Sequence, residues 1–196
     1  LEPPIEKTIP TRDVLLLVDI SASMNHEDFT DEGGLPTNRL VAVQQVVEEF
    51  VEKREGDRVG LIVFGNAPFV QVPLTTDLPL CNQLLNETVV GMAGPKTSIG
   101  DALGLGISLL QDSKSPDKTM ILLTDGNDTA SALPPVEASR VARDRDIRVH
   151  TIAVGNPESV GEEKIDEDTL RAVAENTGGK SYLALDREQL ANIYEE

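Results

Sequence analysis

Five oxygen-bearing side chains in three separate segments have the types and spacing to bind a metal ion. Three of them alternate along one short stretch, and the other two lie far away in the sequence, each next to a predicted strand or helix. The set is Asp19, Ser21, Ser23, Thr97 and Asp125. Two carboxylates and three hydroxyls are an all-oxygen donor set, which suits a hard cation such as Mg²⁺ or Mn²⁺ and suits zinc poorly.

The two carboxylates follow continuous apolar runs, which predict buried strands. Residues 14–18 precede Asp19, and residues 120–124 precede Asp125. Ligands of open α/β sheets bind beyond the carboxyl ends of such strands, so we expect Asp19 and Asp125 to lie close together. Further strands are predicted at 59–64, 147–154 and 181–185.

Strand patterns alternate with helical periodicity along the chain, which is typical of βαβ units. The sequence therefore predicts an α/β fold: a Rossmann-like, doubly wound and mostly parallel sheet with helices on both faces. Residues 69–72 follow a turn at hairpin distance and predict one short antiparallel edge strand. The predicted helices cover 40–51, 78–85 and 99–110, with one opened by Pro134 and Pro135 and two short ones capped by Asp166 and Asp186.

Two local patterns lie beside the candidate donors. Ser98 and Asp101 have the spacing of a capping box at the start of the helix that follows Thr97. The acidic and glycine-rich residues 25–37 predict a long polar loop, a kind of segment that is often functional.

Composition excludes several functions. The 196 residues contain 17 Lys and Arg against 34 Asp and Glu, a net charge of −17, so a nucleic-acid partner is not expected. Cys81 is the single cysteine, and His26 and His150 are the two histidines. These counts exclude a disulfide framework, a cysteine zinc site and the HExxH metalloprotease motif.

The five-residue set resembles the metal-ion-dependent adhesion site of von Willebrand factor type A domains. Residues 58–64, 91–103 and 122–127 are most similar to a bacterial membrane-anchored subfamily, the aerotolerance or Bat proteins, encoded beside MoxR-type AAA+ ATPases. The resemblance covers residues 11–196, which predicts one domain preceded by a linker at residues 1–10.

The resemblance implies a non-enzymatic protein–protein interaction module. Ser21, Ser23 and Thr97 would bind the metal directly, whereas Asp19 and Asp125 would act largely through water. A partner would supply an Asp or Glu carboxylate to the metal; by resemblance it is another von Willebrand A protein or a MoxR-type ATPase. The full-length protein would be anchored in the inner membrane, with this domain as an excised soluble part.

Other interpretations compete with this one. Asp19 and Ser21 could cap a helix, and Asp125 with Gly126 could form a turn. Asp19 could serve a Mg²⁺-dependent phosphohydrolase or phosphotransferase of the haloacid dehalogenase type, but Ser21 stands where that chemistry needs a second acid. A nucleotide-binding Rossmann domain would need a GxGxxG or P-loop motif, which the sequence lacks.

Acidic residues near the motif have simpler explanations. Asp101 suits the N-terminal end of a helix dipole, and Asp128 suits a solvated turn. His26, Asp28 and Asp31 are expected to overhang the site, either as part of a solvated loop or as determinants of partner choice.

Overall fold

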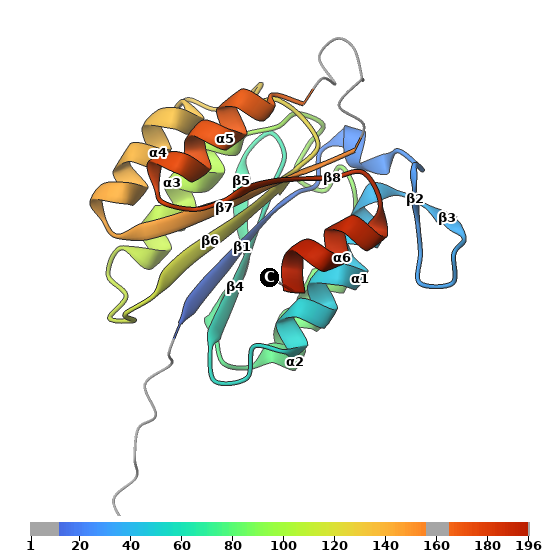
Figure 1. Cartoon of the computed structure of the whole chain (residues 1–196), viewed down its shortest axis with the longest axis horizontal. Helices are drawn as coiled ribbons and strands as arrows, with labels where there is room; N and C mark the ends of the chain where they lie inside the picture. The colour runs from blue at the N-terminus through green and yellow to red at the C-terminus, as the bar shows by residue number, and fades with distance from the viewer. Residues whose placement is uncertain (1–11, 156–164, 196) are drawn as a thin grey trace, which may run out of the picture.

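A six-stranded sheet forms the centre of the computed structural model, which describes residues 12–155 and 165–195 (Figure 1). Neighbouring strands are parallel, except that β4 and β5 are antiparallel. In order across the sheet, the strands are β5 (Pro68–Thr75), β4 (Arg58–Phe64), β1 (Asp13–Asp19), β6 (Lys118–Thr124), β7 (Ile147–Val154) and β8 (Ser181–Ala184). The predicted linker at residues 1–10 lies outside the described residues.

Helices cover both faces of the sheet, as the sequence predicts (Figure 1). One layer contains α1 (Arg39–Glu52), α2 (Leu78–Asn86) and α6 (Arg187–Glu195). The other contains α3 (Ile99–Leu110), α4 (Pro135–Asp144) and α5 (Glu167–Asn176). None of the described helices is both long enough and apolar enough to cross a lipid bilayer.

The central strand β1 is buried on both sides because its apolar run is continuous. Val14, Leu16 and Val18 belong to the core beneath α1, whereas Leu15 and Leu17 belong to the core beneath α3. Burying such a side chain contributes roughly 1.5–3 kcal/mol. The two cores therefore hold the end of β1, and with it Asp19, in a fixed place.

Residues 25–37 are more ordered than the predicted polar loop. A 3₁₀ turn, η1 (Ala22–Asn25), leads into a small antiparallel hairpin of β2 (Phe29–Thr30) and β3 (Pro36–Thr37). Asp31 closes the hairpin turn, because its carboxylate accepts the Leu35 N–H at 2.9 Å while its carbonyl accepts the Gly34 N–H at 3.0 Å. The prediction of a simple loop was wrong, since it overlooked this side-chain turn chemistry.

The predicted capping box at α3 is also wrong. Ser98 makes no side-chain cap, and the Ile99 N–H instead donates to Asp128 Oδ1 at 2.9 Å. Asp101 accepts the N–H groups of Ala132 and Leu133, each at 3.1 Å. Asp101 and Asp128 thus connect α3 to the segment after β6. The edge strand β5 is longer than predicted, at eight residues.

Close packing between α3 and the chain before α4 generates a stability prediction. A Cβ on Gly100 would lie 1.8 Å from the Leu133 carbonyl oxygen, whereas a Cβ on Gly104 would lie 3.4 Å from its nearest neighbour, Leu133 Cδ2. Gly100→Ala should lower the free energy of unfolding by about 1–3 kcal/mol through overpacking. Gly104→Ala, the matched control, should leave it unchanged or raise it by up to about 1 kcal/mol. Urea denaturation of both variants measures the difference; equal effects would contradict the packing.

Candidate metal centre

The carboxyl ends of β1 and β6 form the point at which the order of the sheet reverses. From β1 the chain crosses to β4 on one side, and it returns later to β6 on the other side. Asp19 is the last residue of β1, and Asp125 directly follows β6. The fold therefore brings together two carboxylates that are 106 positions apart in the numbering, at the place where open α/β sheets bind ligands.

Asp19 is fully buried and both of its oxygens are engaged. Oδ1 accepts the Ser21 N–H at 2.8 Å, and Oδ2 accepts the Thr124 hydroxyl at 2.7 Å. Burial and, second, the negative charge of Asp125 raise the pKa of Asp19 to about 7. The cost of this buried charge is what a bound cation would relieve.

Ser21 and Ser23 connect the end of β1 to Asp125. Their hydroxyl oxygens are 3.2 Å apart, and the Ser23 hydroxyl donates to Asp125 Oδ1 at 2.7 Å. Ser21 precedes η1, so the segment winds into a tight turn. The turn directs both hydroxyls toward the carboxylates.

Thr97 reaches the same area from the other side. It is 6% exposed, and its hydroxyl oxygen lies 3.9 Å from the position that a Cβ on Gly126 would occupy. The Thr97 carbonyl accepts the N–H groups of Thr129 and Ala130, which fixes its segment against the one after β6. All five predicted donors thus lie at one end of the sheet.

Two charged residues of the site were missed or misjudged in the sequence. The Arg39 guanidinium donates from Nη1 to Asp125 Oδ2 at 3.0 Å and binds Asp28 through Nε and Nη2, at 2.9 and 2.6 Å. The position of Arg39 at the start of a helix could have indicated its role. A cation there is unfavourable beside the positive end of the helix dipole, so it needs acidic partners. Asp28 is therefore paired, rather than simply solvated over the site.

The charges of the site fit a divalent cation. Asp19, Asp28 and Asp125 with one guanidinium leave two uncompensated negative charges when all three carboxylates are ionised. Two buried polar atoms in adjacent segments, Ser98 Oγ and Asn127 Oδ1, have no hydrogen-bond partner among the described residues. The described part of the chain contains no group of three or more His, Cys, Asp or Glu that could hold a metal. Serine and threonine hydroxyls would therefore have to complete the coordination shell of a bound ion.

The other residues singled out in the sequence lie outside the donor set. The His26 carbonyl accepts the Arg39 N–H at 3.0 Å, and Asp31 closes the hairpin turn. Cys81 is 1% exposed in the core beneath α1 and α2, where burial raises the pKa of its thiol to about 11.

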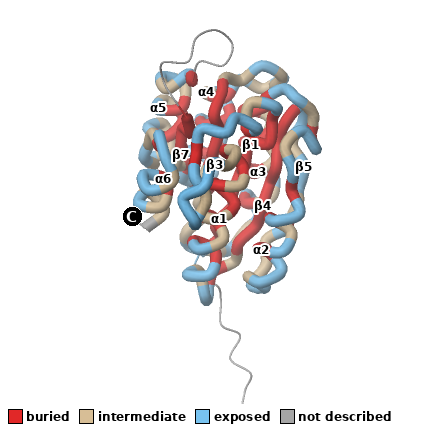
Figure 2. Tube along the Cα trace, turned by 90° about the vertical axis from the view of Figure 1, so that its right-hand side faces the viewer, coloured by how far each residue is buried: buried red, intermediate tan, exposed pale blue. Residues whose placement is uncertain are grey.

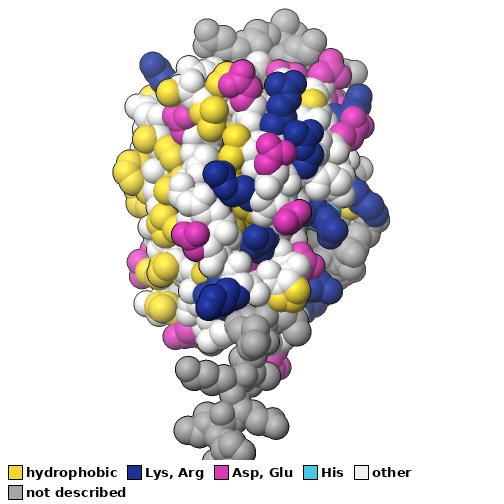
Figure 3. Space-filling view, turned by 90° about the vertical axis from the view of Figure 1, so that its left-hand side faces the viewer, with side chains coloured by type: hydrophobic (Ala, Val, Ile, Leu, Met, Phe, Trp, Pro, Cys, Tyr) yellow, Lys and Arg dark blue, Asp and Glu magenta, His cyan; other side chains and the backbone are white. Residues whose placement is uncertain are grey.

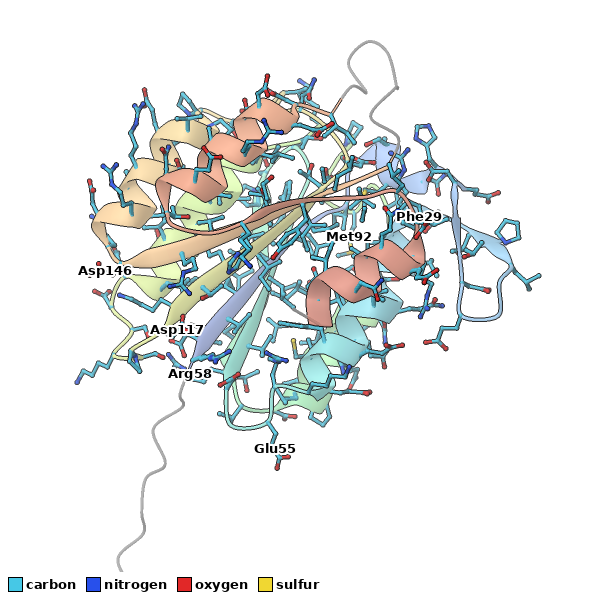
Figure 4. The ribbon with its side chains drawn as sticks, in the orientation of Figure 1. Phe29, Glu55, Arg58, Met92, Asp117 and Asp146 are labelled. Carbon is cyan, nitrogen blue, oxygen red and sulfur yellow. The ribbon has the colours of Figure 1, made fainter. Side chains whose placement is uncertain are left out.

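Basic side chains gather at the opposite end of the molecule. Figure 4 marks both ends, with Phe29 and Met92 near the candidate centre and Arg58 and Asp117 at the starts of the strands. Figure 3 shows several Lys and Arg side chains on the face at this second end, interspersed with Asp and Glu. A cavity of about 320 Å³ there is lined by Arg12, Arg54, Arg148 and Lys180, among others. This cavity is thus remote from the candidate metal centre.

Known structures share this architecture. An aerotolerance-related membrane protein from Bacteroides fragilis superposes with a TM-score of 0.78 at 21% identity, over 93% of this chain and 96% of that one. Proximal thread matrix protein 1 from the mussel byssus, described with a zinc-occupied adhesion-site motif, superposes with a TM-score of 0.73 at 18% identity, over 96% of this chain and 45% of that one. At these identities the likeness shows the fold.

Sequence comparison identifies the family. A curated protein from Borreliella burgdorferi is 24% identical over 185 residues, which cover 87% of this chain and 53% of that protein. The chain spans little more than half the length of the curated relatives it matches. The family model of the von Willebrand factor type A domain matches residues 13–196, and the chain therefore belongs to the von Willebrand factor type A domain family.

Proposed function

We propose that this domain is a metal-dependent protein interaction module. Asp19, Ser21, Ser23, Thr97 and Asp125 hold Mg²⁺ or Mn²⁺, and a partner protein adds an Asp or Glu carboxylate. The observation that carries the proposal is the pair of buried carboxylates beside hydroxyl groups at the point where the sheet order reverses. The zinc-occupied motif described for the mussel protein supports it, while the all-oxygen donors favour Mg²⁺ or Mn²⁺ over zinc here.

A bound divalent ion supplies an open coordination position for an incoming carboxylate. The chain's own residues determine how strongly that position attracts one. Ser21, Ser23 and Thr97 are neutral donors, so they leave the positive charge of the ion largely intact. Asp28 is bound to Arg39, so that pair adds little net charge. The two remaining carboxylates, Asp19 and Asp125, would only balance the charge of the ion, so an incoming carboxylate would meet no excess negative charge.

The geometry disfavours the alternative phosphohydrolase or phosphotransferase. A nucleophilic Asp19 would have to expose an oxygen to substrate, but the residue is fully buried and both of its oxygens accept hydrogen bonds. Members of the von Willebrand factor type A family also act generally as adhesion or interaction modules. We therefore propose no enzymatic activity.

The wider role is inferred from the Bat resemblance. The Bacteroides fragilis relative is described as a membrane protein, and we propose that the full-length form of this chain is anchored in the inner membrane. Its partner would be a MoxR-type AAA+ ATPase or another von Willebrand A protein, bound across residues 21–37, 92–98 and 125–131. With a net charge of −17, the domain should favour a partner whose single acidic contact lies amid neutral or basic surface.

Loss of the Asp19 charge should abolish metal binding. In the wild type, Mg²⁺ at a hundredfold excess over its Kd should stabilise the fold by about 2.7 kcal/mol, which raises the Tm by several degrees. Asp19→Asn should remove this rise and leave the metal-free domain folded, because the change conserves volume. Thermal unfolding with Mg²⁺, Mn²⁺, Zn²⁺ or EDTA measures it, with the exposed Asp112→Asn as control. An equal Mg²⁺ effect in Asp19→Asn and wild type would disprove the site.

The raised pKa of Asp19 predicts a pH dependence in EDTA. The folded protein holds a proton on Asp19 up to pH about 7, whereas an unfolded chain loses it near its ordinary pKa of 3.8. The stability of the metal-free domain should therefore rise by about 1 kcal/mol as the pH falls from 8 to 6. Asp19→Asn should lack this component, as chemical denaturation at both pH values would show. Since protons compete with the metal, Mg²⁺ should stabilise the wild type less at pH 6 than at pH 8.

Partner binding should depend on both the metal and Thr97. Thr97→Ala removes one neutral donor, so it should weaken binding of the partner more than binding of Mg²⁺. Calorimetry with the purified MoxR-type ATPase or sister von Willebrand A protein of the same organism tests this in Mg²⁺ and in EDTA. Equal affinity in the two conditions would mean that the partner docks elsewhere.

A further inference from the structure

Arg39 occupies an unusual position for an arginine. It is the first residue of α1 and is only 6% exposed, although a cation at this end of a helix meets the positive pole of the dipole. Its guanidinium also lies against the backbone at the end of β7, since a Cβ on Gly155 would come within 2.8 Å of its Cζ. Glycine at 155 therefore makes the room that the guanidinium occupies.

The guanidinium joins Asp125 to the base of the β2–β3 hairpin. Nη1 donates to Asp125 Oδ2, on the inner side, while Nε and Nη2 donate to Asp28 at the base of the β2–β3 hairpin, residues 29–37. The Arg39 N–H also donates to the His26 carbonyl. A lysine ammonium could not make these contacts at the same time, because they use the planar fork of donors in the guanidinium.

The hairpin that follows Asp28 projects beside the candidate metal centre. Figure 2 shows β3 and the turn exposed in front of the buried strand ends. Phe29 anchors the hairpin, with 3% exposure, while Leu35 near its tip is 65% exposed. A partner that reaches the metal from this side would meet the hairpin as well.

We propose that Arg39 is a positioning residue that couples metal binding to the order of the β2–β3 hairpin. This inference rests on the metal site proposed above. Arg39 holds Oδ2 of Asp125, which leaves Oδ1, the oxygen already beside the Ser23 hydroxyl, turned toward the other donors. A cation that fixes Asp125 from this side also fixes Arg39, and through it Asp28 and the hairpin.

The coupling is reciprocal by thermodynamic necessity. If metal binding stabilises the ordered hairpin by some factor, the ordered hairpin raises metal affinity by the same factor. Asp28 also neutralises the guanidinium, so Arg39 can orient Asp125 without strongly repelling the ion. Replacing Arg39 by Lys keeps the charge near the metal and removes only the forked geometry, so this substitution isolates positioning from electrostatics.

Hydrogen exchange and calorimetry on the whole domain test the coupling, with Mg²⁺ alone as the probe. In the wild type, Mg²⁺ should slow amide exchange in residues 29–37 several-fold more than in α4, which is remote from the hairpin. Arg39→Lys should weaken Mg²⁺ binding about tenfold, the loss of about 1.4 kcal/mol expected for a charged hydrogen bond, and should abolish the hairpin response. Arg143→Lys, in the exposed Arg143–Asp144 pair, is the matched control and should change neither.

Asp28→Asn provides an independent arm in case Arg39→Lys disturbs folding, since the Asp28 side chain is 40% exposed. Asp28→Asn should still bind Mg²⁺, but Mg²⁺ should no longer slow amide exchange in its hairpin. Its Mg²⁺ affinity should fall by no more than the factor by which Mg²⁺ slows hairpin exchange in the wild type. A wild type that fails to bind Mg²⁺ overturns the metal site and the inference with it. Normal Mg²⁺ binding by Arg39→Lys, or a hairpin response retained in Asp28→Asn, overturns the coupling alone.

Discussion

The burial of two carboxylates at one point of the sheet is the constraint on which the arrangement around it depends. Asp19 and Asp125 are 0% and 1% exposed, and the negative charge of Asp125 adds to the cost of ionising the buried Asp19. Hydrogen-bond donors surround both carboxylates: the Ser21 N–H and the Thr124 hydroxyl at Asp19, and the Ser23 hydroxyl and Arg39 at Asp125. A pair of buried like charges with these donors is expensive for folding alone, which argues that it is retained for binding.

The sheet order explains why the carboxylates meet. β1 and β6 are neighbours whose connections run in opposite directions, an arrangement that leaves a crevice at their carboxyl ends. The loops carrying Ser21, Thr97 and Asp125 fill this space and are held together by bonds between segments, such as the Ala22 N–H to the Pro95 carbonyl at 3.2 Å. Two bonds to α3 add the same support, since Asp128 accepts the Ile99 N–H and Asp101 accepts the Leu133 N–H.

The features of the fold that depend on local sequence patterns were predicted from the sequence alone. The buried strands follow from continuous apolar runs such as residues 14–18, and the α5 cap follows from Asp166, whose carboxylate accepts the Thr169 N–H. The five candidate donors were identified by their place after strands and before a helix. Contacts made across the fold were not predictable in this way: Ser98 has the spacing of a cap, yet Asp128, 29 positions beyond Ile99, makes the bond. The contact of Arg39 with Asp28 and Asp125 was likewise not predictable, because Asp125 lies far from both residues in the sequence.

The charge balance of the site determines what kind of ligand it can prefer. Neutral hydroxyls and two carboxylates would leave a divalent ion with no excess negative charge around it, and Arg39 is already engaged by Asp28. Arg54 and Lys180 line a cavity at the other end of the molecule. A phosphate ester brings more negative charge to the metal than a single carboxylate does, and the Arg39 guanidinium is already held by Asp28 and Asp125. This charge balance favours a single protein carboxylate over a phosphate ester as the group that completes the site.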